Sequence, residues 1–220
     1  LILPEADDLR TVEAAERLTK FCHVVLCTTE EKLEKLLESS DVENKFRGSV
    51  DRLLKLVKCV DIEAEEGLRE EFAQKYVELS QGKKWQVSVE EAREKVHDTV
   101  YFSVLAIRCG YADMILGGLT HASRDFFKPC LRLLERREVV YEMALFALPD
   151  SHPAGIYENN LVMFSDVALN PVPTAEALAH IAVGACKTLR DTIPVEDLPF
   201  VNGALLSYST RGSGQGPSVE

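Results

Sequence analysis

Residues 114–129 read MILGGLTHASRDFFKP, and this stretch decides the fold. It begins with the apolar run Met114–Leu116, passes through two glycines, and continues with the spacing of a helix. Its hydroxyl groups and the free N–H groups of the helix start lie where proteins bind anions. The stretch therefore predicts one strand and one helix of an α/β fold, with a ligand near the end of the strand.

Further apolar runs predict strands of the same kind. They are rich in Val, Ile and Leu with little polar alternation, as expected for strands covered on both faces. These runs are Leu1–Leu3, His23–Cys27, Cys59–Ile62, Val139–Leu148, Leu161–Phe164 and Ala204–Tyr208. Helical patterns separate them, so we expect βαβ units in layers with mostly parallel sheets.

Several helix starts carry recognisable capping residues. Thr28 with Glu31, and Ser88 with Glu91, fit the capping box, in which two side chains satisfy free backbone donors reciprocally. Thr174 is placed to cap a later helix, and Asp7 or Asp8 an early one.

The chain should form two lobes with a cleft. A boundary near Glu138 is indicated because a helical pattern ends there in a charged run and a new apolar strand follows. We expect residues 1–138 to form the first α/β domain, incomplete without a C-terminal return of the chain, and residues 139–220 to begin a second. Both ends look cut, since the chain starts at Leu1 and stops at Glu220 just after a loop.

Composition excludes some classes of partner. With 25 Lys and Arg against 36 Asp and Glu, the net charge of −11 argues against a broad nucleic-acid surface. No apolar run approaches the roughly 20 residues that span a bilayer, so no membrane association is expected. The six cysteines form no CxxC pair and no zinc-site spacing, which favours a reducing, cytoplasmic location and no bound metal.

A glycine-rich loop follows the last predicted strand. Ser209, Thr210 and Arg211 precede Gly212 and Ser213, and the loop continues to 216. Glycines let consecutive N–H groups point at one spot, and the hydroxyls and guanidinium would complete an anion site. The spacing is neither that of a Walker A loop nor that of a Rossmann fold, so a flexible Gly/Ser loop is the alternative.

Three other stretches hold candidate binding residues, each with a structural alternative. Residues 117–128 contain His121, Ser123 and, on one helix face, Arg124 and Lys128. One interpretation is that these residues all bind an anion. The structural alternative is that His121 is a hydrogen-bonded structural residue, that Ser123 caps the helix, and that the two basic residues form a solvated face. Asp166 and Asn170 follow a predicted strand, and they either face the cleft or shape a turn. Lys83 and Lys84 stand next to Trp85, and this stretch either holds a phosphate or forms a solvated loop.

Together and in this order, the motifs resemble the phosphate acetyltransferase family, including its ethanolamine-utilisation and phosphate butyryltransferase relatives. The resemblance covers nearly the whole chain. It is carried by Leu3-Pro4-Glu5 with Arg10-Thr11, Glu90-Glu91-Ala92-Arg93 with Tyr101-Phe102, Ala112-Asp113, Gly117-Gly118 with His121, Asn170-Pro171 with Pro173-Thr174-Ala175-Glu176, and Leu206–Gly214.

The resemblance implies a two-domain, three-layer α/β/α fold similar to that of isocitrate and isopropylmalate dehydrogenases, usually as a homodimer, with the site in the cleft. It implies reversible transfer of an acetyl group between acetyl phosphate and coenzyme A in cytoplasmic acetate metabolism. Coenzyme A is then a substrate, with no further cofactor and no metal in the acyl transfer. The family's general base and its reactive serine and arginine lie in a later segment, so the catalytic residues are expected beyond Glu220.

This chain departs from the family pattern at several positions. Lys128 stands where the family usually has Arg, and Lys83-Lys84 stand in a loop that usually contains an Arg. Lysine keeps the positive charge at these positions but cannot form the bidentate hydrogen bonds of a guanidinium. Val167 replaces a frequent Cys, and Arg211 replaces the usual Lys.

Two other functions are alternatives to the acetyltransferase. One is a phosphate butyryltransferase-like enzyme with a longer acyl pocket, against which the His121 motif argues. The other is a fragment or paralogue that binds coenzyme A or an acyl phosphate without turnover.

Overall fold

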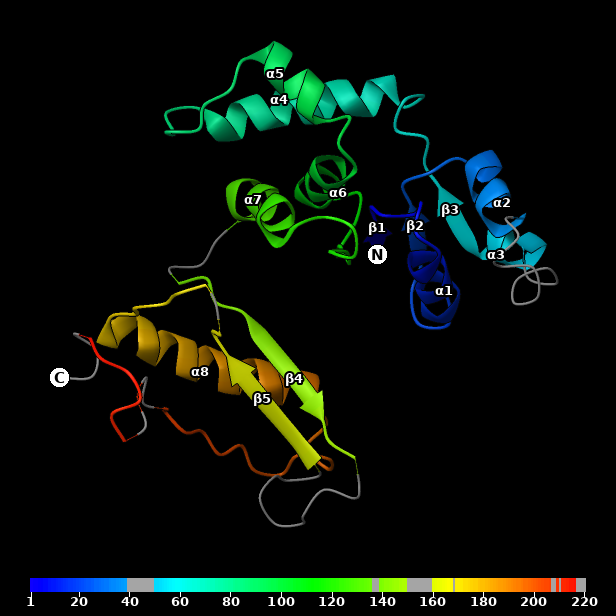
Figure 1. The fold of residues 1–220 in the computed structure, drawn as a ribbon. Helices are drawn as coiled ribbons and strands as arrows, with labels where there is room; N and C mark the ends of the chain where they lie inside the picture. The colour runs from blue at the N-terminus through cyan, green and yellow to red at the C-terminus, as the bar shows by residue number, and fades with distance from the viewer. Residues whose placement is uncertain are drawn as a thin grey trace. The chain divides into compact units, whose positions relative to one another are not determined.

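The computed structural model describes residues 1–38, 50–135, 139–149, 160–167, 169–206, 209 and 211–216. Its chain divides into two compact units, Leu1–Glu135 and Arg136–Glu220 (Figure 1). The boundary predicted near Glu138 lies at a residue outside the described ones.

The first unit is built on a parallel sheet with the order β1 (Ile2–Leu3), β2 (Val24–Leu26), β3 (Val57–Cys59). On the other side of β1, Ile115 forms a parallel bridge with Ile2. The bridge is held by hydrogen bonds from Ile2 N–H to the carbonyl of Met114 (2.8 Å) and from Leu116 N–H to the carbonyl of Ile2 (3.2 Å). The beginning of the stretch 114–129 thus lies in the sheet beside β1.

Helices cover both faces of this sheet. They are α1 (Leu9–Leu18), α2 (Glu30–Glu38), α3 (Val50–Leu56), α4 (Glu66–Ser80), α5 (Val89–Lys95), α6 (Thr99–Arg108) and α7 (Ser123–Leu133). Successive residues of β1 point to opposite cores, because Ile2 packs in the cluster that contains Phe72 of α4 and Leu3 in the cluster that contains Val12 of α1. Burial on both faces explains why the strands are apolar without alternation.

The helix caps confirm one predicted box and correct the other. Ser88 Oγ accepts from Glu91 N–H (3.2 Å), and Glu91 Oε2 accepts from Ser88 N–H (2.8 Å), so the capping box of α5 is confirmed. The box predicted for Thr28 and Glu31 is wrong, because the hydroxyl of the next residue, Thr29, acts as the cap and accepts from Lys32 N–H (3.1 Å). The N–H of Thr28 donates instead to the carbonyl of Leu26 (3.0 Å), which keeps Thr28 in the turn that leaves β2.

The second unit contains an antiparallel pair, β4 (Met143–Ala147) and β5 (Leu161–Ser165), with α8 (Ala175–Thr192) in contact with β5. Thr174 caps α8 as predicted, since its hydroxyl accepts from Ala177 N–H (3.1 Å). The predicted strand Ala204–Tyr208 is not seen: residues 204–206 form no strand, having no partner strand among the described residues, and residues 207 and 208 lie outside them.

The paired strands of the second unit leave apolar side chains exposed. Phe146 and Phe164 meet edge to face with ring centroids 5.6 Å apart, yet they are 47% and 43% exposed. The prediction that both faces of these strands are covered is therefore not met by the described residues. Within the same residues, no helix is both long enough and apolar enough to cross a bilayer.

Candidate functional site

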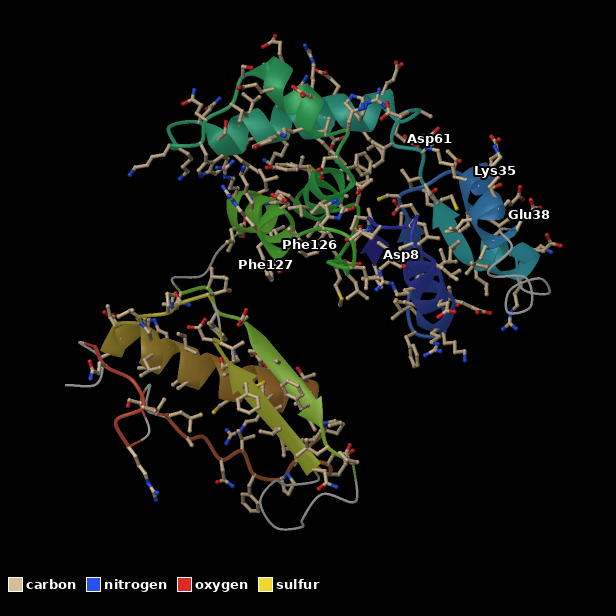
Figure 2. The ribbon with its side chains drawn as sticks, viewed as in Figure 1. Asp8, Lys35, Glu38, Asp61, Phe126 and Phe127 are labelled. Carbon is tan, nitrogen blue, oxygen red and sulfur yellow. The ribbon has the colours of Figure 1, made fainter. Side chains whose placement is uncertain are left out.

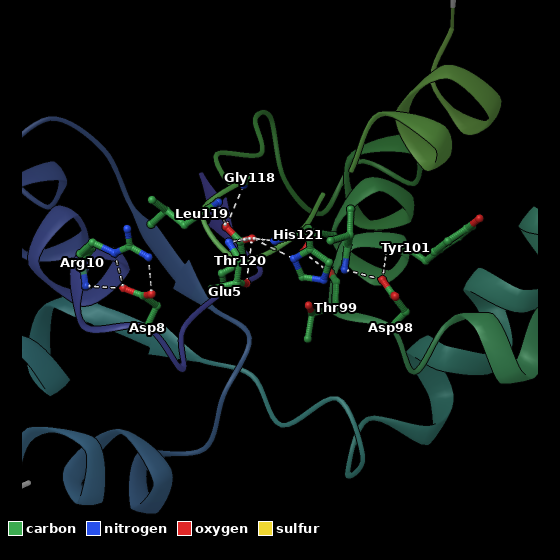
Figure 3. A network of polar contacts seen from close by, with 12 residues as sticks. Glu5, Asp8, Arg10, Asp98, Thr99, Tyr101, Gly118, Leu119, Thr120 and His121 are labelled. Atoms are coloured by element: carbon green, nitrogen blue, oxygen red, sulfur yellow. Dashed lines mark hydrogen bonds and ion pairs between the residues drawn. The ribbon is translucent and has the colours of Figure 1, made fainter. Parts of the chain in front are cut away.

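The carboxylate of Glu5 is the centre of a polar network just beyond the end of β1 (Figure 3). The residue is only 1% exposed. Its Oε2 accepts from the N–H groups of Gly118 and Leu119, both at 2.8 Å. Its Oε1 accepts from the N–H (2.8 Å) and hydroxyl (3.0 Å) of Thr120 and from the N–H of His121 (3.0 Å). Successive residues of the loop that leads into α7 are thus wrapped around one buried carboxylate.

The same contacts keep Glu5 ionised. Burial by itself would raise the pKa of this carboxyl, because a charged group loses hydration in the interior. The hydrogen bonds from the N–H of Leu119, the ring of His121 and the N–H of Thr120 outweigh burial and hold the pKa of Glu5 far below its ordinary value. The loop therefore surrounds a buried carboxylate whose two oxygens both accept hydrogen bonds.

The imidazole of His121 belongs to this network. Its Nδ1 lies 2.8 Å from Glu5 Oε1, and its side chain is 29% exposed. Its other ring nitrogen, Nε2, forms no hydrogen bond with any residue that the structure describes. The predicted alternative of a hydrogen-bonded histidine therefore matches the contact of Nδ1.

Two glycines make this arrangement possible. A Cβ at Gly117 would lie 2.7 Å from Cε2 of Phe126, 3.1 Å from Cγ of Pro4 and 3.2 Å from Oε2 of Glu5, so any larger residue would force these neighbours to move. Gly118 has a φ of +101°, a backbone conformation that other residues rarely adopt. The glycine pair thus lets the loop turn tightly against Glu5.

Helix α7 begins directly after this loop. Its N-cap is Ala122, which provides no side-chain hydrogen bond, so the predicted alternative of Ser123 as the cap is wrong. Ser123 is the first helical residue and is exposed, as are Arg124 and Lys128 farther along. Phe126 and Phe127 of α7 are labelled in Figure 2, and their rings meet edge to face with centroids 6.1 Å apart. An open helix start next to two exposed cations suits an anion.

The Lys83-Lys84 loop is tied to the same helix. Both lysines are exposed after the end of α4, and the next residue, Trp85, packs against Tyr76 with ring centroids 6.4 Å apart. The guanidinium of Arg132 in α7 lies over the Trp85 ring, 5.5 Å from its centroid. Since Arg132 is one helical turn beyond Lys128, this stacking anchors the basic loop to the C-terminal half of α7.

In the second unit, Asp166 and Asn170 contact each other. Asp166 Oδ1 accepts from the N–H (3.2 Å) and the side-chain amide (3.1 Å) of Asn170, whose amide also donates to the carbonyl of Val140 (2.8 Å). Asp166 has a φ of +58°, so the chain turns sharply as it leaves β5. These contacts match the predicted alternative of a shaped turn.

The glycine-rich loop is closed by its first serine. Ser209 is buried, and its hydroxyl accepts from Gly214 N–H (2.9 Å). Arg211 and Gly212 both have positive φ, at 54° and 76°, and Arg211 is exposed. The predicted ligand Thr210 lies outside the described residues. Ser213 is exposed and lies in the sequence between the two residues that this hydrogen bond joins. Such a turn can direct backbone N–H groups toward one anion.

Glu5 was not among the site residues predicted from sequence. A signal for it exists, because Glu5 follows a buried strand directly and the carboxyl ends of neighbouring parallel strands lie at one edge of the sheet. The residues between them do not reveal that Ile115 lies beside β1. Among the described residues, no group of three His, Cys, Asp or Glu side chains is arranged to hold a metal ion.

Comparison with known proteins gives a match over the whole chain. A family model described as phosphate acetyl/butaryl transferase matches residues 1–220. The phosphate acetyltransferase of Clostridium acetobutylicum is 31% identical over 100% of this chain and 62% of its own length. That of Corynebacterium glutamicum is 30% identical over 100% of this chain and 60% of its own. The chain thus spans about 60% of the length of these relatives.

Solved structures show the same fold. The EutD phosphotransacetylase from Staphylococcus aureus superposes with a TM-score of 0.65 at 24% identity, over 85% of this chain and 51% of that one. A phosphotransacetylase from Streptococcus pyogenes gives a TM-score of 0.63 at 24% identity, over 99% of this chain and 60% of that one. Together with the helices on both faces of the parallel sheet, this likeness confirms the predicted α/β/α architecture.

Proposed function

The chain belongs to the phosphate acetyl/butaryl transferase family, and from this we propose that its protein reversibly transfers an acetyl group between acetyl phosphate and coenzyme A. The observation that carries the proposal is the match of the family over every residue of the chain, with relatives named phosphate acetyltransferase. These names favour acetyl over butyryl as the acyl group. Coenzyme A acts as a substrate, and the transfer needs no resident cofactor or metal.

We assign the phosphate contacts of the first unit to α7 and its surroundings. Lys128, with Lys83 and Lys84 on the loop anchored by Arg132, neutralises the acyl phosphate or the phosphates of coenzyme A. His121 and Ser123 lie at the open start of the helix and offer polar groups to the same ligand.

In the second unit, the loop that begins at Ser209 is the proposed phosphate cradle. Arg211 supplies charge, Gly212 and Ser213 supply backbone N–H groups, and Thr210 a hydroxyl. Ser209 holds the loop closed through its bond to Gly214. Asp166 and Asn170, which hydrogen-bond to each other just after β5, are also proposed to bind the substrate.

The chemical step requires groups beyond those assigned here. The thiol of coenzyme A, with a pKa of about 8.5, must lose its proton to a base, and the acyl oxygen must meet donors as charge develops. No residue of this chain is assigned as that base, which the family resemblance expects after Glu220. The protein is proposed to work as a cytoplasmic homodimer.

The test uses the full-length protein. Release of the coenzyme A thiol from acetyl-CoA is followed with a thiol reagent as phosphate is added, with butyryl-CoA as the competing substrate. We expect phosphate-dependent turnover with acetyl-CoA preferred. A butyryl-CoA preference would reassign the acyl group, and calorimetric binding of coenzyme A without turnover would replace the enzyme with a binding protein.

Lys128→Ala tests the proposed phosphate contact. It should raise KM for acetyl phosphate by roughly tenfold, because one charge-assisted contact is worth about 1.5 kcal/mol. Lys55→Ala removes an exposed lysine of α3 and serves as the matched control. Equal KM values for the two variants would contradict the role of Lys128.

A further inference from the structure

We propose that Glu5 is the positioning residue of the site: it holds the imidazole of His121 with its proton on Nδ1 and leaves Nε2 as the atom that meets the substrate. The inference rests on the proposed acyl transfer for its place in the reaction. The positioning itself rests on the contacts of Glu5.

The first step concerns the proton. An ionised carboxylate can accept hydrogen bonds but cannot donate one. Every other contact of Glu5 is with a donor, namely the N–H groups of Gly118, Leu119, Thr120 and His121 and the hydroxyl of Thr120. The ring nitrogen at 2.8 Å must therefore also donate, so the neutral imidazole carries its proton on Nδ1.

The second step concerns orientation. The N–H and the ring of His121 both bind the same atom, Oε1 of Glu5, at 3.0 and 2.8 Å. The other oxygen of the carboxylate, Oε2, is in turn held by the N–H groups of Gly118 and Leu119. The ring is thus fixed relative to the backbone of its own loop as well as to β1.

A second carboxylate–histidine pair in the chain shows what an ordinary contact looks like. Glu63 Oε1 also lies 2.8 Å from Nδ1 of His97, but these side chains are 66% and 44% exposed. The hydrogen bonds of the described residues give Glu63 no backbone donors at its carboxylate. The Glu63–His97 pair is therefore a surface contact and a natural control for Glu5 and His121.

The third step concerns the free nitrogen. With its proton on Nδ1, the neutral ring presents Nε2 as a hydrogen-bond acceptor, and Nε2 has no partner among the described residues. The complementary substrate group is a donor, either the thiol of coenzyme A or the hydroxyl of a protonated phosphate. The contact is a hydrogen bond from that donor to Nε2.

The experiment observes the proton directly in the full-length protein. Histidine labelled with 15N is examined by long-range 1H–15N NMR, with the His121 signals assigned by their loss in His121→Asn. Wild type should show a protonated Nδ1 and a bare Nε2. In Glu5→Ala this fixed tautomer should be lost, while Glu63→Gln should leave the His121 signals unchanged. A proton on Nε2 in the wild type, or the same tautomer without Glu5, would overturn the proposal.

Kinetics supplies the second readout. A folded Glu5→Ala protein should lose roughly 100-fold in kcat/KM, the loss that accompanies a misplacement of about 1 Å, and Glu63→Gln should lose nothing. If Glu5→Ala does not fold, His121→Asn replaces it, because its side-chain amide can donate to Glu5 in place of Nδ1 but has no Nε2. We expect His121→Asn to keep wild-type thermal stability and to lose activity. Wild-type turnover by His121→Asn would refute the role of Nε2.

The two substrates separate the possible donors. A rise in KM for coenzyme A alone in His121→Asn identifies the thiol, and a rise for phosphate alone identifies the phosphate hydroxyl. The proposed function can also fail independently. If wild type shows the expected tautomer but no turnover, the acyl-transfer reaction is wrong and the positioning by Glu5 stands.

Discussion

Replacement of Gly117 by alanine should loosen the loop from Glu5. The added Cβ would lie 2.7 Å from the Phe126 ring, 3.1 Å from Pro4 and 3.2 Å from Glu5 Oε2. The Phe126 ring can move, but Pro4 has a rigid ring and Glu5 is held by its donors. Overpacking of this kind costs about 1–3 kcal/mol, and each N–H displaced from a charged acceptor adds about 1.5–3 kcal/mol.

Two measurements on the full-length protein check this prediction. Urea unfolding should show a lower midpoint for the first unit, and hydrogen exchange should be faster for the peptide that contains Gly118–His121. Gly67→Ala is the matched control, because its Cβ would meet nothing within 4 Å at the start of α4. It should be neutral or stabilise by up to about 1 kcal/mol. Unchanged stability and exchange in Gly117→Ala would refute the packing argument.

Three further predictions concern other parts of the chain. Gly184→Ala would place a Cβ 2.1 Å from the hydroxyl oxygen of Tyr141 and should destabilise the second unit by about 1–3 kcal/mol, whereas in a Tyr141→Ala background it should stabilise α8, as a double-mutant unfolding cycle would reveal. Arg93 donates two hydrogen bonds to Glu70, at 2.8 and 2.9 Å, and these lower the pKa of Glu70 from 4.5 to about 2. The contact therefore stabilises the fold above pH 4.5 and is lost as the pH falls toward 2. The stability difference between wild type and Glu70→Gln should shrink over that range, and a difference that grows instead would contradict the sign. Burial raises the pKa of Cys27 to about 11, so a thiol reagent at pH 8 should label exposed Cys22 first, and equal rates would count against the packing of Cys27.

Much of the fold could be predicted because it depends on local patterns. Strands buried on both faces leave apolar runs such as Val24–Leu26, and helix starts leave residues such as Ser88 with Glu91. The errors arose where the pattern fits two neighbouring positions or needs a distant partner. Thr28 and Thr29 are chemically equal, and only the hydrogen bond of Thr28 to the end of β2 decides between them. Ala204–Tyr208 was apolar enough for a strand, but its described residues have nothing to pair with.

The polar network around Glu5 could be predicted from the sequence only in part. Gly117, Gly118 and His121 stand out in the sequence because glycines before a helix suggest an anion loop. The hydrogen-bond partner of Gly118 and His121, Glu5, is more than a hundred residues away, at a separation of 113 to Gly118. That contact follows from the order of strands in the sheet, which no local pattern encodes. The stacking of Arg132 on Trp85 could not be predicted either, because these residues are also distant in the sequence.

The position of β1 in the sheet also sets the order in which the protein can assemble during its synthesis. β1 can pair with β2 as soon as residue 26 has left the ribosome, but its other edge waits for Ile115. Until the next few residues emerge, Glu5 is a carboxylate without its donors and must stay hydrated. The bridge between Ile2 and Ile115 and the loop around Glu5 then form together. In a nascent chain, the hydrogen bonds of Glu5 and the second edge of β1 therefore form in one folding event.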